Sequence, residues 1–88
     1  RKASGKKNEI DLSSLNLSGA NLRGANLSGV VLFDTNLSFA DLSFVDLSNA
    51  ELFFADLSGA RLSNANLFGA NISSANLFGA FLVGANLS

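Results

Sequence analysis

The sequence predicts an all-β solenoid in which short extended segments alternate with regular corners. Leu or Ile stands at every fifth position from Leu12 to Leu87, and a mostly small apolar residue, usually Ala, precedes each of them by two positions. Ser and Gly are the most frequent residues at the two positions that follow. A helix repeats its apolar face every ~3.6 residues and a strand about every two, so a period of five requires a turn in each unit.

Each five-residue unit contains one extended segment and one corner. Ala20 and Leu22, for example, flank a polar residue, and this alternation directs both apolar side chains to the same side of the chain. The pair Ser18-Gly19 illustrates the corner, because glycine adopts backbone angles that other residues disfavour. We therefore expect Leu and Ala to point into a coil and the other three positions to point outward.

Asparagine recurs immediately before the inner leucine. Such a residue can hydrogen-bond along the stack in a side-chain ladder, or it can bond to the backbone at the adjacent corner. Both roles are structural, and the sequence leaves both open. The residues concerned are Asn16, Asn21, Asn26, Asn36, Asn66, Asn71, Asn76 and Asn86.

Units such as 20–24 (ANLRG) and 65–69 (ANLFG) follow the pattern A(N/D)LXX. From residue 10 to residue 88 the sequence resembles the pentapeptide-repeat family, which has this signature. The resemblance implies a right-handed quadrilateral β-helix with four units per coil, about four coils, and residues twenty apart above one another. The inner side chains would then form four ladders: Leu12, Leu32, Leu52 and Ile72; Leu17, Leu37, Leu57 and Leu77; Leu22, Leu42, Leu62 and Leu82; Leu27, Leu47, Leu67 and Leu87.

Charge divides the chain into two parts. Residues 1–9 carry four basic residues and one acid, whereas residues 10–88 carry two basic and six acidic residues. We expect residues 1–9 to form a basic linker or flexible arm and residues 10–88 to form the β-helix. The overall net charge of -1 is too close to balance to favour direct binding of nucleic acid.

The composition argues against catalysis. The chain has no His, Cys, Met, Trp or Tyr, and so lacks the usual proton shuttle, thiol nucleophile and soft metal ligands. The serines stand mainly at corners without a neighbouring base, and the glycines follow the corners instead of forming a phosphate-binding loop. We therefore expect no enzyme activity, catalytic residue, cofactor or metal. No apolar run is long enough for a membrane span and no signal peptide opens the chain, so a cytoplasmic location is expected.

Phenylalanine is the main departure from the repeat at outward positions, where function rather than scaffold is expected. Phe33 and Phe53 stand twenty residues apart and Phe54 adjoins them, which predicts an exposed aromatic patch. Such a patch is typical of a contact site, although the rings can instead fold over the corner and shield one another. Phe39 and Phe44 fall at other corners, which favours an interaction surface spread around the stack.

Acidic residues occupy four successive positions before the inner leucine: Asp41, Asp46, Glu51 and Asp56. Four units per coil place them on four faces, as a girdle that keeps the rod soluble. Some pentapeptide-repeat proteins inhibit DNA gyrase by imitating duplex DNA, which requires a dense negative surface on one side. The girdle does not match that requirement, and gyrase inhibition is kept as the alternative function.

The sequence thus predicts a non-enzymatic protein-interaction or structural scaffold module within a longer chain. Its expected partner is another protein or another part of the larger chain. Solenoid ends without caps expose apolar residues and strand edges, so end-to-end self-association is also open. Ile10 and Leu15 are larger than the alanines at the same position and are expected to plug the N-terminal end.

Overall fold

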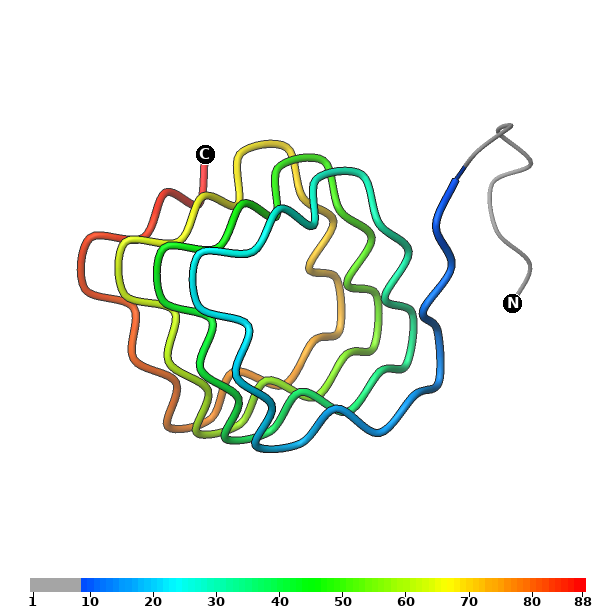
Figure 1. Cartoon of the computed structure of the whole chain (residues 1–88), viewed down its shortest axis with the longest axis horizontal. Helices are drawn as coiled ribbons and strands as arrows, with labels where there is room; N and C mark the ends of the chain where they lie inside the picture. The colour runs from blue at the N-terminus through cyan, green and yellow to red at the C-terminus, as the bar shows by residue number, and fades with distance from the viewer. Residues whose placement is uncertain (1–8) are drawn as a thin grey trace.

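The computed structural model describes residues 9–88, which wind into a stack of four-sided turns (Figure 1). Twelve parallel bridges each join a residue to the one twenty positions later, from Asp11 with Val31 to Asn66 with Asn86. Four five-residue units therefore complete one turn. Within residues 9–88 there is no helix, and the pairing stays as isolated bridges without extending into longer strands. The basic arm expected for residues 1–9 lies outside the described residues except for Glu9.

The corner of each unit is a tight turn after the inner leucine. The leucine carbonyl accepts a hydrogen bond from the N–H three residues later, as Leu17 O does from Ala20 N at 3.1 Å. The second corner residue has a φ between 58° and 76° in every unit from Ser14 to Gly84. A positive φ at this position is typical of a type II turn, and glycine adopts it without a steric penalty.

The asparagine before each inner leucine bonds to the corner. In all eight cases its Oδ1 accepts a hydrogen bond from the backbone N–H two residues later, as from Ser18 N to Asn16 at 3.1 Å. The Ser18 hydroxyl also donates to Asn16 Oδ1, at 2.7 Å. One contact along the stack joins Asn86 Nδ2 to Asn66 Oδ1 at 3.5 Å. Of the two roles that the sequence left open, bonding to the corner is therefore the general one.

The inner side chains are most deeply buried in the middle of the stack. Every inner leucine from Leu32 to Leu67 is at most 3% exposed. The inner residues of the first and last turns are only partly buried, and Leu87 is 49% exposed. Because each middle turn has a neighbour on both sides, burial depends on stacking between turns rather than on any one turn.

A few residues depart from the expected pattern. Val31 occupies an outward position yet is 1% exposed, and it is bridged to residues in the turns on both sides. Thr35 replaces an inner alanine, and its buried hydroxyl donates to Leu12 O at 2.9 Å, so the buried polar group is paired. Ile10 and Leu15 are 58% and 45% exposed, and no turn of the described residues lies beneath them, so their role as a plug of this end stays a prediction.

Candidate interaction surface

Phe33, Phe53 and Phe54 form a cluster that we call the aromatic corner. The Phe33 and Phe53 ring centroids lie 5.8 Å apart in a stacked arrangement. The Phe54 ring meets both edge to face, with its centroid 4.4 Å from that of Phe53 and 6.1 Å from that of Phe33. These separations are in the attractive range for aromatic pairs. Phe33 and Phe53 are partly buried while Phe54 is 51% exposed, so the rings shield one another and still leave apolar surface open.

The backbone of the aromatic corner does not depend on its rings. The same corner carries serine pairs in the neighbouring turns, at 13–14 on one side and 73–74 on the other. Asp34 N donates to Phe53 O at 2.9 Å, and Phe54 N donates to Ser73 O at 3.1 Å. The backbone hydrogen bonds between turns therefore follow the same register whether the corner carries phenylalanine or serine. The corner therefore accepts serine, and turn geometry does not explain the aromatic residues.

Three phenylalanines stand at the corner position that suits glycine best. Phe39, Phe44 and Phe54 have φ values of 60° to 61°, in the left-handed region. For a residue with a side chain this conformation costs about 1–2 kcal/mol of conformational energy, whereas for glycine it costs almost none. Phenylalanine at this position does not stabilise the backbone. Any stabilisation it provides must come from the contacts of its ring.

The structure does not bring Phe39 and Phe44 into the aromatic corner. Phe44 lies at another corner, where the Arg23 guanidinium carbon sits 4.9 Å from the ring centroid in a cation–π contact. Phe39 is 73% exposed, and its ring lies against Gly59 of the next turn. The five predicted aromatic residues therefore occupy three separate corners.

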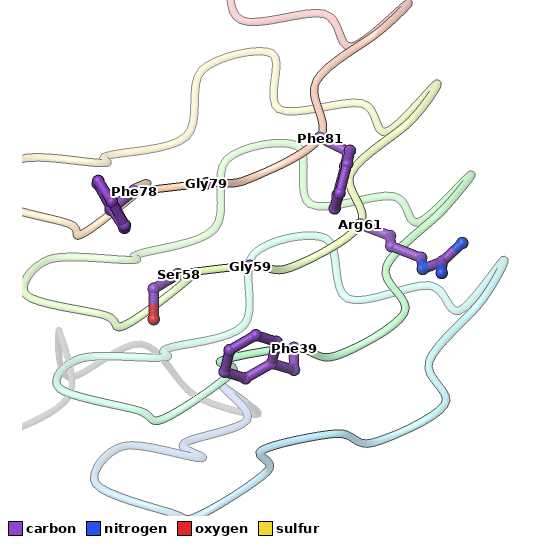
Figure 2. A pocket seen from close by; sticks show the side chains of 7 residues that line it. All are labelled: Phe39, Ser58, Gly59, Arg61, Phe78, Gly79 and Phe81. Atoms are coloured by element: carbon purple, nitrogen blue, oxygen red, sulfur yellow. The ribbon is translucent and has the colours of Figure 1, made fainter.

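Phe78 and Phe81 are not part of the surface that the sequence predicts. Together with Phe39 and Arg61 they line an open groove with a volume of about 520 Å³ (Figure 2). The twenty-residue register could have revealed it, because Phe81 follows Arg61 by twenty positions and Phe39 precedes Gly59 by twenty.

The acidic girdle is spread over four bridge columns. No member of the girdle is bridged to another member; the pairs in the following turn are Asp41 with Arg61, Asp46 with Asn66, Glu51 with Asn71, and Asp56 with Asn76. The three aspartates each accept the backbone N–H two residues later, as the asparagines do. They are therefore corner-forming residues that also carry charge.

Hydrogen bonds from serine lower the pKa of all three of these aspartates, and Asp46 and Asp56 illustrate the geometry. The Ser48 hydroxyl donates to Asp46 at 2.7 Å and the Ser48 N–H donates at 3.0 Å. The Ser58 hydroxyl donates to Asp56 at 2.6 Å and the Ser58 N–H at 3.0 Å. Because these bonds favour the ionised form, the pKa of each carboxyl lies below its ordinary value of 3.8.

We expect stability to fall at acid pH partly through Asp46 and Asp56. Because the folded-state pKa of each carboxyl is below 3.8, the stability that it contributes to the fold is fully present above pH 3.8. This contribution is lost as the pH falls through the folded-state pKa. The double variant Asp46→Asn/Asp56→Asn keeps the oxygen that accepts the corner bonds but cannot titrate. Its melting temperature, followed by circular dichroism, should decline less steeply below pH 4 than that of the wild type (about pH 4 being the ordinary carboxyl range). An unchanged slope would contradict this assignment.

Residues 9–88 hold no group of three or more acidic side chains close enough to share a metal ion. Across the same range, no helix has the length and apolar character needed to cross a bilayer.

Serine hydroxyls at several corners donate hydrogen bonds to Asn or Asp side-chain oxygens, as at Ser38 and Ser58.

The family model for pentapeptide repeats matches residues 10–49 and 46–82. The chain belongs to the pentapeptide repeat family. The pentapeptide repeats account for the five-residue period and the twenty-residue pairing, and the fold is the quadrilateral right-handed β-helix of this family.

Two cyanobacterial pentapeptide repeat proteins of known structure resemble this chain. The protein alr5209 of Nostoc PCC 7120 superposes with a TM-score of 0.86 at 42% identity, covering 88% of this chain and 64% of that one. Rfr23 of Cyanothece 51142 gives a TM-score of 0.72 at 39% identity, covering 93% and 63%. This chain therefore spans just under two thirds of the length of each. A search of curated proteins found no match.

A more distant structural neighbour is QnrB1, described as a plasmid-mediated fluoroquinolone resistance protein. It superposes with a TM-score of 0.50 at 19% identity, covering 91% of this chain and 59% of that one. At this identity the likeness establishes a shared fold and nothing about shared function.

Proposed function

We propose that this pentapeptide repeat is a non-enzymatic protein-interaction module that contacts its partner through the aromatic corner. The observation that carries the proposal is the clustering of Phe33, Phe53 and Phe54 at one corner, with Phe54 about half exposed. Serines fill the same corner in the neighbouring turns, so the scaffold does not require the rings. Contiguous exposed apolar surface of this kind is typical of a contact site.

The structural alternative is a scaffold or spacer in which the three rings only shield one another. Aromatic pairs contribute about 0.5–1.5 kcal/mol each beyond the area they bury, so mutual shielding has a measurable effect on stability. An interaction module loses its partner when the rings are removed, whereas a spacer loses only this stabilisation.

The variant Phe33→Ser/Phe53→Ser/Phe54→Ser is expected to fold and to lose its protein partner. Serine already occupies both positions of this corner in the turns on either side, at 13–14 and 73–74. Affinity capture from a lysate of the source organism, followed by mass spectrometry, compares the variant with the wild type. Thermal melting by circular dichroism, run in parallel, shows whether the variant remains cooperatively folded.

The matched control is Phe68→Ser, which removes an exposed phenylalanine from a different corner. Phe68 is 56% exposed, and Ser28 and Ser48 occupy the same position of that corner in other turns. A partner retained by the wild type and by Phe68→Ser but lost by the triple variant supports the proposal. Equal capture by all three proteins favours a spacer, and a triple variant without a cooperative transition favours self-shielding.

DNA mimicry directed at gyrase is the second candidate, and the four acids of the girdle are the feature that favours it. Duplex DNA presents about one charge per 1.7 Å of its axis, whereas the girdle distributes its charges over four columns. Asp41 also stands beside Arg61, which opposes its charge. We expect no inhibition of gyrase supercoiling at micromolar protein concentration. Inhibition in that assay would replace the interaction-module proposal.

Several finer expectations belong to the same proposal. Twenty residues per turn divide the described residues into about four coils. The cytoplasmic location remains a prediction from the sequence. Ile10 and Leu87 are exposed at opposite ends of the stack, which keeps end-to-end self-association open beside a protein partner or the rest of a longer chain.

A further inference from the structure

The groove described above is a second candidate binding surface, at a different corner from the aromatic corner. Its floor is the backbone at Gly59, with the Phe39 ring on one side and Phe78 and Phe81 on the turn beyond (Figure 2). Arg61 extends from the edge of the groove, beside Phe81. The volume of about 520 Å³ is within the usual range for ligand sites, roughly 300–1,000 Å³.

The shape of the groove depends on glycine. A Cβ added at Gly59 would lie 2.5 Å from a carbon of the Phe39 ring, so the ring can rest there only because that side chain is missing. At Gly79 the nearest atom to an added Cβ is Gly59 N, at 3.9 Å. Two glycines stacked at one corner therefore open the space that Phe39 and Phe78 flank.

The phenylalanines of the groove differ from the other clustered rings in having no aromatic partner. Among residues 9–88, ring contacts join the three rings of the aromatic corner, and Phe44 makes a cation–π contact with Arg23. Phe39, Phe78 and Phe81 make neither kind of contact, and they are 73%, 84% and 57% exposed. The groove therefore holds concentrated apolar surface that the described residues do not cover.

Arg61 adds a positive charge to this apolar surface. Within residues 9–88 the only cations are Arg23 and Arg61, and Arg23 is already engaged with Phe44. Asp41 is the bridged neighbour of Arg61 in the adjacent turn, and the hydrogen bonds from Ser43 lower the pKa of its carboxyl more than the Arg61 charge does. The Arg61 guanidinium can therefore also pair with an acidic group that enters the groove.

We propose that the groove binds an extended acidic peptide segment of a protein partner. A large apolar side chain of that segment packs beside Gly79, between the Phe39 ring and Phe78, and an adjacent carboxylate pairs with Arg61. The openness of the groove favours a peptide over a small molecule, because small ligands are usually buried by roughly 70–90%. A peptide brings its own backbone to cover rings that are otherwise exposed. The inference is independent of the aromatic corner, which lies on other columns of the stack.

The experiment is a nuclear magnetic resonance titration of the isotope-labelled chain with the blocked peptide Gly-Phe-Asp-Gly. We expect saturable shifts of the backbone amides of Ser58, Gly59 and Gly79. The blocked peptide Gly-Phe-Asn-Gly has the same shape without the charge, and it should bind about two- to fivefold more weakly, as expected for one exposed ion pair.

Three variants assign the binding to particular side chains. Arg61→Gln should remove the preference for the acidic peptide, while the matched control Arg23→Gln should retain it. Phe39→Gly should abolish saturable binding, because it deletes one wall of the groove. The fold tolerates this change, since the φ of 60° at Phe39 suits glycine better than phenylalanine.

The proposal is overturned if no saturable shift appears at these amides up to about 10 mM peptide, a concentration well above that needed to detect millimolar binding. It is also overturned if the Asp and Asn peptides bind equally, because Arg61 would then play no part. Shifts confined to Phe33, Phe53 and Phe54 would reject the groove and leave the aromatic corner as the peptide-binding surface.

Discussion

Leu52→Asp is expected to abolish the cooperative folding of the β-helix. The Leu52 side chain is 0% exposed and lies in a middle turn, with paired turns on both sides. Losing a buried leucine side chain costs about 2–5 kcal/mol, and an unpaired buried carboxylate adds several more. Their sum is comparable with the total stability of a small domain, about 5–15 kcal/mol. Thermal melting followed by far-ultraviolet circular dichroism should show no cooperative transition.

The matched control is Leu87→Asp, the same substitution at the same position of a unit in the last turn. Leu87 is 49% exposed, so its carboxylate would keep most of its hydration. We expect a stability change of about 1 kcal/mol or less, the range of ordinary surface substitutions. A soluble Leu52→Asp protein that melts like the wild type would show that this side chain does not face the core.

Ala60→Leu is expected to destabilise the fold by overpacking. Ala60 is 0% exposed, and the hydrogen bonds from Arg61 N to Ala40 O and from Phe81 N to Ala60 O hold its neighbouring turns close. Turns paired in this way are about 4.8 Å apart, so the space between them does not accommodate a longer side chain. We expect a loss of about 1–3 kcal/mol, measured by urea denaturation.

Ala80→Leu tests whether confinement causes this loss. Ala80 follows Ala60 by twenty residues and is only partly buried, so a leucine there can extend toward the open end of the stack. Its effect should be clearly smaller than that of Ala60→Leu. Equal losses at both positions would point to intrinsic backbone preference instead of packing. Ala60→Val should be mild, because Val45 is already buried at the equivalent position of another unit.

Much of the scaffold could be predicted from the sequence because its physical causes are local. The five-residue period requires a corner after each inner leucine, and glycine at positions such as Gly19 and Gly29 marks where φ is positive. The pairing at twenty residues agrees with the family resemblance. Burial is not uniform along the ladders, because within the described residues Leu12 and Leu82 have a turn on one side only, whereas Leu42 has a turn on each side.

The candidate surfaces could be predicted only in part. Because Phe33 and Phe53 are twenty residues apart, the sequence predicts that they lie at one corner. Only the structure shows that the Phe54 ring contacts both of them edge to face. The twenty-residue register places Phe81 after Arg61 and Phe39 before Gly59, so it could have brought the residues of the groove together. It could not show that they enclose a groove, because that depends on the direction in which the Phe39 ring leans against Gly59.

By itself, the sequence determined the repeat unit, its corners and the residues that face inward, since each follows from side-chain alternation and glycine geometry within five residues. The tertiary structure alone decided which asparagine bonds form, how burial varies along the stack, and which rings meet. Those outcomes depend on side-chain directions between turns that are twenty residues apart, and local preferences do not fix such directions.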